Sequence, residues 1–229
     1  AIEDSNPSAS PSPIVGNGHN LEDSNGCNAK APEARCDQEL FVQPAETVHR
    51  SLDLLFVIDT SGSLNEERSA IASGIDSFVR QLPLDVDYQI AVMLAHGSRS
   101  AFSGRLYHHA NHGPVLSSKK MTTSRIRSEL SYLVTHTSSD RHSDGGEEGL
   151  YSLQKSLSGG NLRESQAKGF FRKDAALAVI FIADENDICA RYPANVRPVY
   201  DPDGYEIPAY RRDCGNVTYT SVLSQLRAL

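Results

Sequence analysis

The sequence lacks several features that define common classes of protein. Lysine and arginine total 22 against 29 aspartates and glutamates, a net charge of −7, so the basic surface that nucleic-acid binding requires is missing. No apolar run approaches the roughly 20 residues of a membrane-spanning helix. We therefore expect no nucleic acid as a partner and no membrane span. The chain starts at Ala1 without methionine, so we expect a processed or trimmed product whose signal peptide is absent.

Cysteine is scarce, and its spacing excludes two common uses. The four cysteines fit neither a CxxC zinc site nor a redox CxxC motif. They fall into two local pairs, which predicts one disulfide between Cys27 and Cys36 and another between Cys189 and Cys214. Disulfides indicate an extracytoplasmic location, secreted or attached to the cell surface. The alternative is four unpaired thiols in a cytosolic protein.

The first 48 residues lack any helical or strand periodicity. Serine, proline, asparagine, glycine and aspartate dominate there, and such a composition cannot bury enough apolar surface to fold alone. We expect residues 1–48 to be a flexible, disordered Ser/Pro-rich leader that carries the small cysteine loop. Residues 49–229 are expected to form one folded domain.

Three short apolar runs alternate with helical patterns along the rest of the chain. An almost unbroken apolar run predicts a strand covered on both faces, as in a parallel sheet. This alternation predicts an α/β fold with a doubly wound, mostly parallel central sheet flanked by helices. The expected strands are 54–58, 88–95 and 175–183, and the main expected helices are 64–82, 124–134, 147–158 and 217–229.

Oxygen-bearing side chains follow two of these strands. Asp59, Ser61 and Ser63 come directly after the first strand, and Asp184 follows the third. The carboxyl ends of parallel strands meet at one edge of the sheet, where ligands bind. Hard oxygen donors suit Mg²⁺ or Mn²⁺, and less well Ca²⁺. We expect residues 185–187, which follow Asp184, to form a solvated loop. The spacing of the histidines matches no zinc site, so we expect them to lie in surface loops.

Residues 54–63 resemble the signature of von Willebrand factor A (VWA) domains, whose Asp-x-Ser-x-Ser motif forms a metal-ion-dependent adhesion site. The resemblance covers roughly residues 50–229 and implies a mostly parallel sheet wrapped by helices. It implies that Asp59, Ser61, Ser63 and Asp184 hold the metal, and that a carboxylate of a protein ligand completes its coordination. The pattern Gly-Gly-Glu-Glu-Gly-Leu together with Asp-Glu-Asn-Asp resembles a bacterial branch of exported proteins with such domains.

The chain departs from the family pattern in two places. The family takes a threonine ligand from a second loop, and here that place is taken by Glu147, or by Asp144, Ser143 or Thr137 if the loop length differs. The family also has a further strand and a closing helix, and the pattern indicates neither after residues 217–229. We expect either a cut chain or a second polypeptide that completes the sheet.

Three functions remain open at this point. The leading hypothesis is a non-enzymatic, metal-dependent protein-binding or adhesion module. A metal-assisted phosphohydrolase is the second, although haloacid-dehalogenase-like phosphatases need an aspartate where this chain has Ser61. The third is a structural fibre or pilus-tip subunit with a vestigial metal site.

Overall fold

The computed structural model describes residues 51–83, 85–137, 146–192, 195 and 206–229. They belong to one compact unit, Thr47–Leu229. The expected leader and the expected pair of Cys27 and Cys36 lie outside the described residues. No described helix combines the length and apolar character that crossing a bilayer requires.

The described part of the chain has an α/β fold with five strands and six α-helices. The strands are β1 (Ser51–Ile58), β2 (Asp87–Leu94), β3 (Leu106–Tyr107), β4 (Leu116–Ser117) and β5 (Ala176–Ile182). The helices are α1 (Arg68–Arg80), α2 (Thr123–Thr135), α3 (Gly149–Ser156), α4 (Gly159–Ala167), α5 (Glu206–Asp213) and α6 (Tyr219–Arg227).

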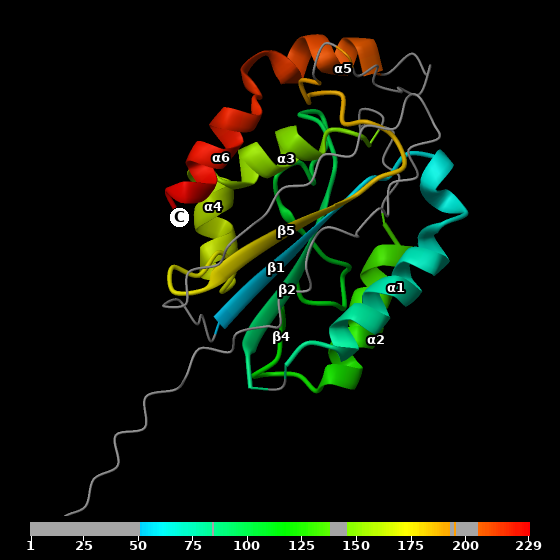
Figure 1. Ribbon diagram of the computed structural model, residues 1–229, viewed down its shortest axis with the longest axis vertical. Coiled ribbons are helices and arrows are strands. Elements are labelled where there is room, and N and C mark those ends of the chain that lie inside the picture. The colour runs from blue at the N-terminus through cyan, green and yellow to red at the C-terminus, as the bar shows by residue number, and fades with distance from the viewer. Residues whose placement is uncertain (1–50, 84, 138–145, 193–194, 196–205) are drawn as a thin grey trace, which may run out of the picture. The chain divides into compact units, whose positions relative to one another are not determined.

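The sheet is mixed and mostly parallel. Strand β1 lies between β2 and β5 and is parallel to both (Figure 1). The two-residue strands β3 and β4 pair antiparallel with the other side of β2. Among the described residues, β5 is therefore an edge strand with β1 as its neighbour.

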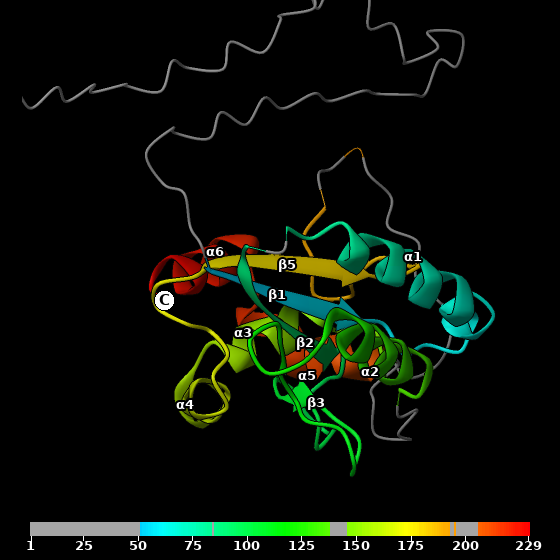
Figure 2. The ribbon, with the colours of Figure 1, turned by 90° about the horizontal axis from the view of Figure 1, so that it is seen from below.

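The alternate residues of β1 enter two separate hydrophobic cores. Leu54, Phe56 and Ile58 pack on the side of α1 and α2, whereas Leu55 and Val57 pack on the side of α3 and α6. Figures 1 and 2 show these helix pairs on opposite sides of the sheet. Both faces of β1 are covered, which explains why its last six residues are all buried. The doubly wound VWA arrangement itself stays a prediction.

The helices differ from the sequence expectation mainly at their starts. A 3₁₀ turn over Ser63–Asn65 precedes α1, which begins at Arg68. Helix α2 is capped by the Thr122 side chain, which accepts a hydrogen bond from the Arg125 backbone, so the helix begins one residue before the expected range 124–134. Helix α4 is an addition to the expected elements, because its sequence has no apolar stripe.

Candidate metal centre

The first element of the site is Asp59, the residue that follows β1. Its backbone N–H donates to the carbonyl oxygen of Ile182 over 2.9 Å, and the Ala95 N–H donates to the carbonyl of Ile58 over 2.8 Å. These bonds bring the ends of β5, β1 and β2 together at one edge of the sheet. Asp59 is only 1% exposed there.

The loop after Asp59 directs side-chain oxygens toward one another. One carboxylate oxygen of Asp59 accepts a hydrogen bond from the backbone N–H of Ser61 over 2.6 Å. The hydroxyls of Ser61 and Ser63 are 3.0 Å apart. The other carboxylate oxygen, Oδ2 of Asp59, is buried and has no hydrogen-bond partner among the described residues. A buried carboxylate oxygen without a partner is unfavourable unless a cation is beside it.

Three carboxylates meet at this edge. Asp59, Asp184 and Glu185 each offer one oxygen, and these oxygens all lie within 4.8 Å of one another. Ser63 donates a hydrogen bond to Glu185 over 3.2 Å. The sequence assigned Glu185 to a solvated loop, and the structure instead places it in the cluster; its position directly after Asp184 was the signal available.

Crowding and burial disfavour the charged form of these carboxyls. Burial raises the pKa of Asp59 to about 6, against the opposing hydrogen bonds from Ser61, and the charge of Asp184 adds to the rise. Burial, followed by a hydrogen bond to Asp184, raises the pKa of Glu185 to about 7. A bound divalent cation would favour the ionised forms. The donor set of carboxylate and hydroxyl oxygens fits Mg²⁺, Mn²⁺ or Ca²⁺.

The second loop reaches this edge through Gly146 and Glu147. The backbone N–H of Thr60 donates to the Gly146 carbonyl over 3.2 Å. Gly146 has a φ of 93°, and a Cβ there would lie 2.5 Å from the Thr60 hydroxyl, so glycine is required. Glu147 is 4% exposed and lines a cavity of about 190 Å³ together with Asp59 and Glu185.

The other second-loop candidates are placed differently. The Thr137 hydroxyl accepts a hydrogen bond from the guanidinium of Arg68. Ser143 and Asp144 lie outside the described residues. Of the four candidates, Glu147 is the one that the structure places in a cavity shared with Asp59.

A buried histidine supports the loop that follows β1. The Thr60 hydroxyl lies 2.8 Å from Nε2 of His96, and Nδ1 of His96 lies 2.7 Å from the Ser100 hydroxyl. His96 is fully buried, so its expected place in a surface loop is wrong. It directly follows the expected strand 88–95, which was the available signal. Ser100 orients the His96 ring, and His96 in turn holds the Thr60 side chain. These contacts support the loop that carries Asp59 and Ser61.

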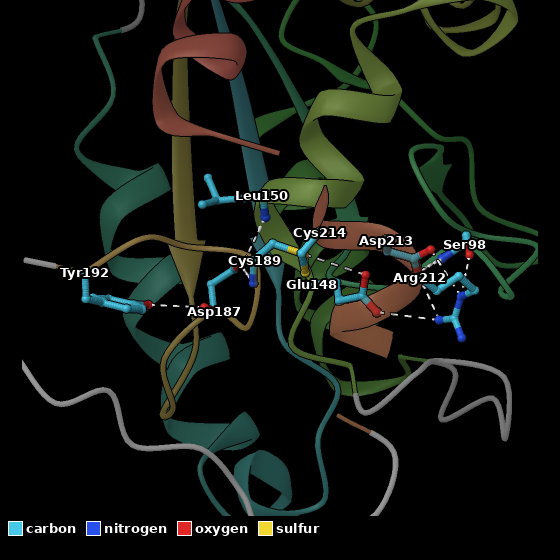
Figure 3. Close-up of a disulfide and its surroundings, with 9 residues drawn as sticks. All are labelled: Ser98, Glu148, Leu150, Asp187, Cys189, Tyr192, Arg212, Asp213 and Cys214. Carbon is cyan, nitrogen blue, oxygen red and sulfur yellow. Dashed lines mark hydrogen bonds and ion pairs between the residues drawn. A yellow bond between two sulfur atoms is a disulfide. The ribbon is translucent and has the colours of Figure 1, made fainter. Parts of the chain in front are cut away.

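The loop after β5 is attached to α3 beside the candidate metal centre. Cys189 and Cys214 form a disulfide, as predicted. Figure 3 shows Asp187 accepting hydrogen bonds from the backbone of Leu150 and Cys189, over 2.7 and 2.8 Å. The disulfide is compatible with an extracytoplasmic location.

A charged cluster lies on the other side of the disulfide. Glu148 is fully buried, and its carboxylate is 3.9 Å from the guanidinium of Arg212 (Figure 3). Arg212 also pairs with Asp213, whose carboxylate accepts a hydrogen bond from the Ser98 backbone. These contacts attach α5 to the loop after β2 and to the start of α3.

Comparisons of the chain with models of protein families, with curated proteins and with solved structures find no match. The resemblance to VWA domains therefore stays a prediction based on the sequence motif.

Proposed function

We propose that the chain is a divalent-cation-dependent protein-binding module. The observation that supports this is the meeting of the Asp59, Asp184 and Glu185 carboxylates within 4.8 Å of one another. Ser61 and Ser63 add hydroxyl oxygens beside them. Mg²⁺, or Mn²⁺ or Ca²⁺ in its place, would bind these oxygens, and a carboxylate of a protein partner would complete its coordination. Adhesion at a cell surface, or after secretion, is the setting that we propose for this module.

Metal titration tests the proposal. We expect Mn²⁺ and Mg²⁺ to bind the purified protein in isothermal titration calorimetry, and the Asp59→Asn variant to lose at least tenfold in affinity. Asp174→Asn is the matched control, because Asp174 is exposed and is not part of the cluster. Absence of binding, or equal binding by the Asp59→Asn variant, would contradict the proposal.

The module is proposed to be non-enzymatic, and an assay separates it from a phosphohydrolase. We expect no hydrolysis of p-nitrophenyl phosphate in the presence of Mg²⁺. Hydrolysis that the Asp59→Asn variant loses would replace the binding function by a metal-assisted phosphohydrolase.

We also propose that an extended segment of a second polypeptide pairs with β5. Among the described residues this strand pairs with β1 alone, and all of its residues are at least partly exposed. A groove of about 560 Å³ runs between β5 and α6, with Val179 and Val222 in its apolar lining and Lys173 and Arg227 among its polar residues. A partner strand with alternating apolar residues and an acidic residue would match this groove.

A further inference from the structure

A cavity beside the metal centre has apolar walls. Its volume is about 190 Å³, and it lies between the carboxyl ends of β1 and β5 and the start of α3. Leu150, Phe181 and Tyr192 contribute to its lining. Phe181 is 46% exposed, and the Tyr192 hydroxyl donates a hydrogen bond to the backbone of Asp187 over 3.3 Å (Figure 3).

The same cavity is acidic at its inner end. Four carboxylates line it, those of Asp59, Glu147, Glu185 and Asp187. The Oδ2 atom of Asp59 is buried and has no hydrogen-bond partner among the described residues. The cavity therefore combines apolar surface for a hydrocarbon chain with carboxylates that attract a positive charge.

We propose that this cavity binds a lysine side chain of the protein partner. Its hydrocarbon stem would pack against Leu150, Phe181 and Tyr192, and its ammonium group would donate hydrogen bonds to the carboxylates at the inner end. The proposal rests on the proposed function, because the same partner supplies the carboxylate that binds the metal.

Other side chains fit the cavity less well. An apolar side chain would leave the negative charge that remains around the bound metal without a positive partner in the cavity. An acidic side chain would be repelled by the four carboxylates that line the cavity. The divalent cation, held by the oxygens of Asp59, Asp184 and Glu185, would by itself leave the apolar walls without a contact. A lysine side chain would contact the apolar walls with its hydrocarbon stem and the carboxylates with its ammonium group.

The charge of the whole edge supports a basic group in the partner. Five carboxylates, those of Asp59, Glu147, Asp184, Glu185 and Asp187, carry −5 when ionised, and the Arg68 guanidinium, which acts on Asp59, adds +1. A divalent cation leaves −2, and the partner's carboxylate on the metal would make it −3. A lysine in the cavity restores −2. The structure thus favours a partner that presents an acid and a base side by side.

The experiment uses two small probes of nearly equal shape. N-acetyl-lysine N-methylamide is titrated into ¹⁵N-labelled protein that is saturated with Mg²⁺, and N-acetyl-norleucine N-methylamide is the uncharged control. We expect the lysine probe to shift the amide resonances of Gly149, Leu150 and Tyr192, with an affinity at least fivefold above that of norleucine. Equal responses to both probes, or no response to lysine, would overturn the proposal.

Two variants separate this proposal from the metal-dependent function. Leu150→Trp fills the cavity, and Tyr192→Ala removes part of its wall in the loop after β5. Both are expected to weaken lysine binding at least threefold and to leave Mn²⁺ affinity within twofold of the wild type. Unchanged lysine binding in both variants would overturn the cavity assignment, whereas absence of Mn²⁺ binding by the wild type would overturn the proposed function alone, since lysine binding is also measured in EDTA.

Discussion

The carboxylate of Asp187 caps helix α3 from a different segment of the chain: it accepts a hydrogen bond from the backbone N–H of Leu150 over 2.7 Å. The residue that precedes the helix, Glu148, makes no capping hydrogen bond with its side chain. Asp187 also accepts from the Cys189 backbone. The Asp187 side chain therefore accepts a hydrogen bond from a backbone N–H at the start of α3 and also orders the loop that leads to the disulfide.

Removal of this cap should destabilise the protein. We expect Asp187→Ala to lower the free energy of unfolding by about 1–3 kcal/mol, since backbone donors near the start of α3 lose their acceptor. Urea denaturation followed by circular dichroism measures this change. Asp174→Ala, at an exposed position, is the control and should change stability by less than about 0.5 kcal/mol; equal losses in the two variants would show that Asp187 is not a cap.

The metal-free protein should become less stable as the pH rises. Burial raises the pKa of Asp59 and Asp187 to about 6, and that of Glu185 to about 7. Between about pH 4 and about pH 7 the folded state therefore binds more protons than the unfolded chain, so the free energy of unfolding falls as pH rises. Mg²⁺, if it binds as proposed, would bind the ionised carboxylates, so it should stabilise the protein more at about pH 7.5 than at about pH 5.

Calorimetric melting in EDTA and in excess Mg²⁺ at both pH values checks this expectation. The Asp59→Asn variant lacks one of the carboxyls whose pKa is raised by burial. Both the pH dependence of its stability and its stabilisation by Mg²⁺ should therefore be smaller. A metal-free protein that melts higher at about pH 7.5 than at about pH 5 would contradict the expected direction of the pH dependence.

Arg172 joins the starts of β1 and β2. Its guanidinium donates to the Asp53 carboxylate over 2.8 Å and to the Asp87 carboxylate over 2.7 Å. Its backbone N–H donates to the other oxygen of Asp53. Asp53 is buried, and burial raises its pKa although the Arg172 bonds oppose the rise.

Loss of the Arg172 side chain should be strongly destabilising. We expect Arg172→Ala to lower the free energy of unfolding by about 3–5 kcal/mol, because the buried Asp53 charge loses its partner. The double variant Asp53→Asn with Arg172→Ala should recover part of this loss, since it removes the uncompensated charge. Denaturant titrations of the two single variants and the double variant form the test, and strictly additive losses would contradict it.

The outer edge of β5 gives a prediction about the backbone. The Ile182 carbonyl faces the β1 side, because it accepts from Asp59. In a parallel pair, alternate residues face the same neighbour, so Ala178 faces β1 and Val179 faces the outer edge. Ala178→Pro should cost about 3 kcal/mol or more, and Val179→Pro should cost little more than Val179→Ala. Equal losses from the two prolines would show that the outer edge is also hydrogen-bonded.

The sheet could be predicted from the sequence where burial is uniform. The apolar runs of β1 and β2 have no polar alternation, so only a strand covered on both faces fits them. The run of β5 predicts its strand equally well, but its residues are all at least partly exposed, so the expected cover on both faces is wrong for this strand. The two-residue strand β4 could not be predicted in this way, because a pair of residues has no measurable period. Helix α4 could not be predicted either, because it has no apolar stripe. The Asn161 side chain attaches this helix to the rest of the fold by donating a hydrogen bond to the Ser103 carbonyl.

The candidate site could be predicted in part for a similar reason. Asp59 and Asp184 were accessible to sequence reasoning because each directly follows a strand. Glu185 follows Asp184 directly, but the direction of a loop side chain depends on the backbone of that loop, so the sequence did not predict its place in the cluster. His96 was misplaced because its burial depends on Thr60 and Ser100, which surround it only in the folded chain.

The disulfide brings the Cα atoms of Cys189 and Cys214 to within 4.8 Å of each other. The stretch between them thus begins and ends at nearly one point of the domain. Residues added or removed between Tyr192 and α5 consequently leave unchanged the distance that the rest of the fold must span. In a protein-engineering setting, we expect that this stretch can be exchanged for new recognition sequences while the sheet is kept intact.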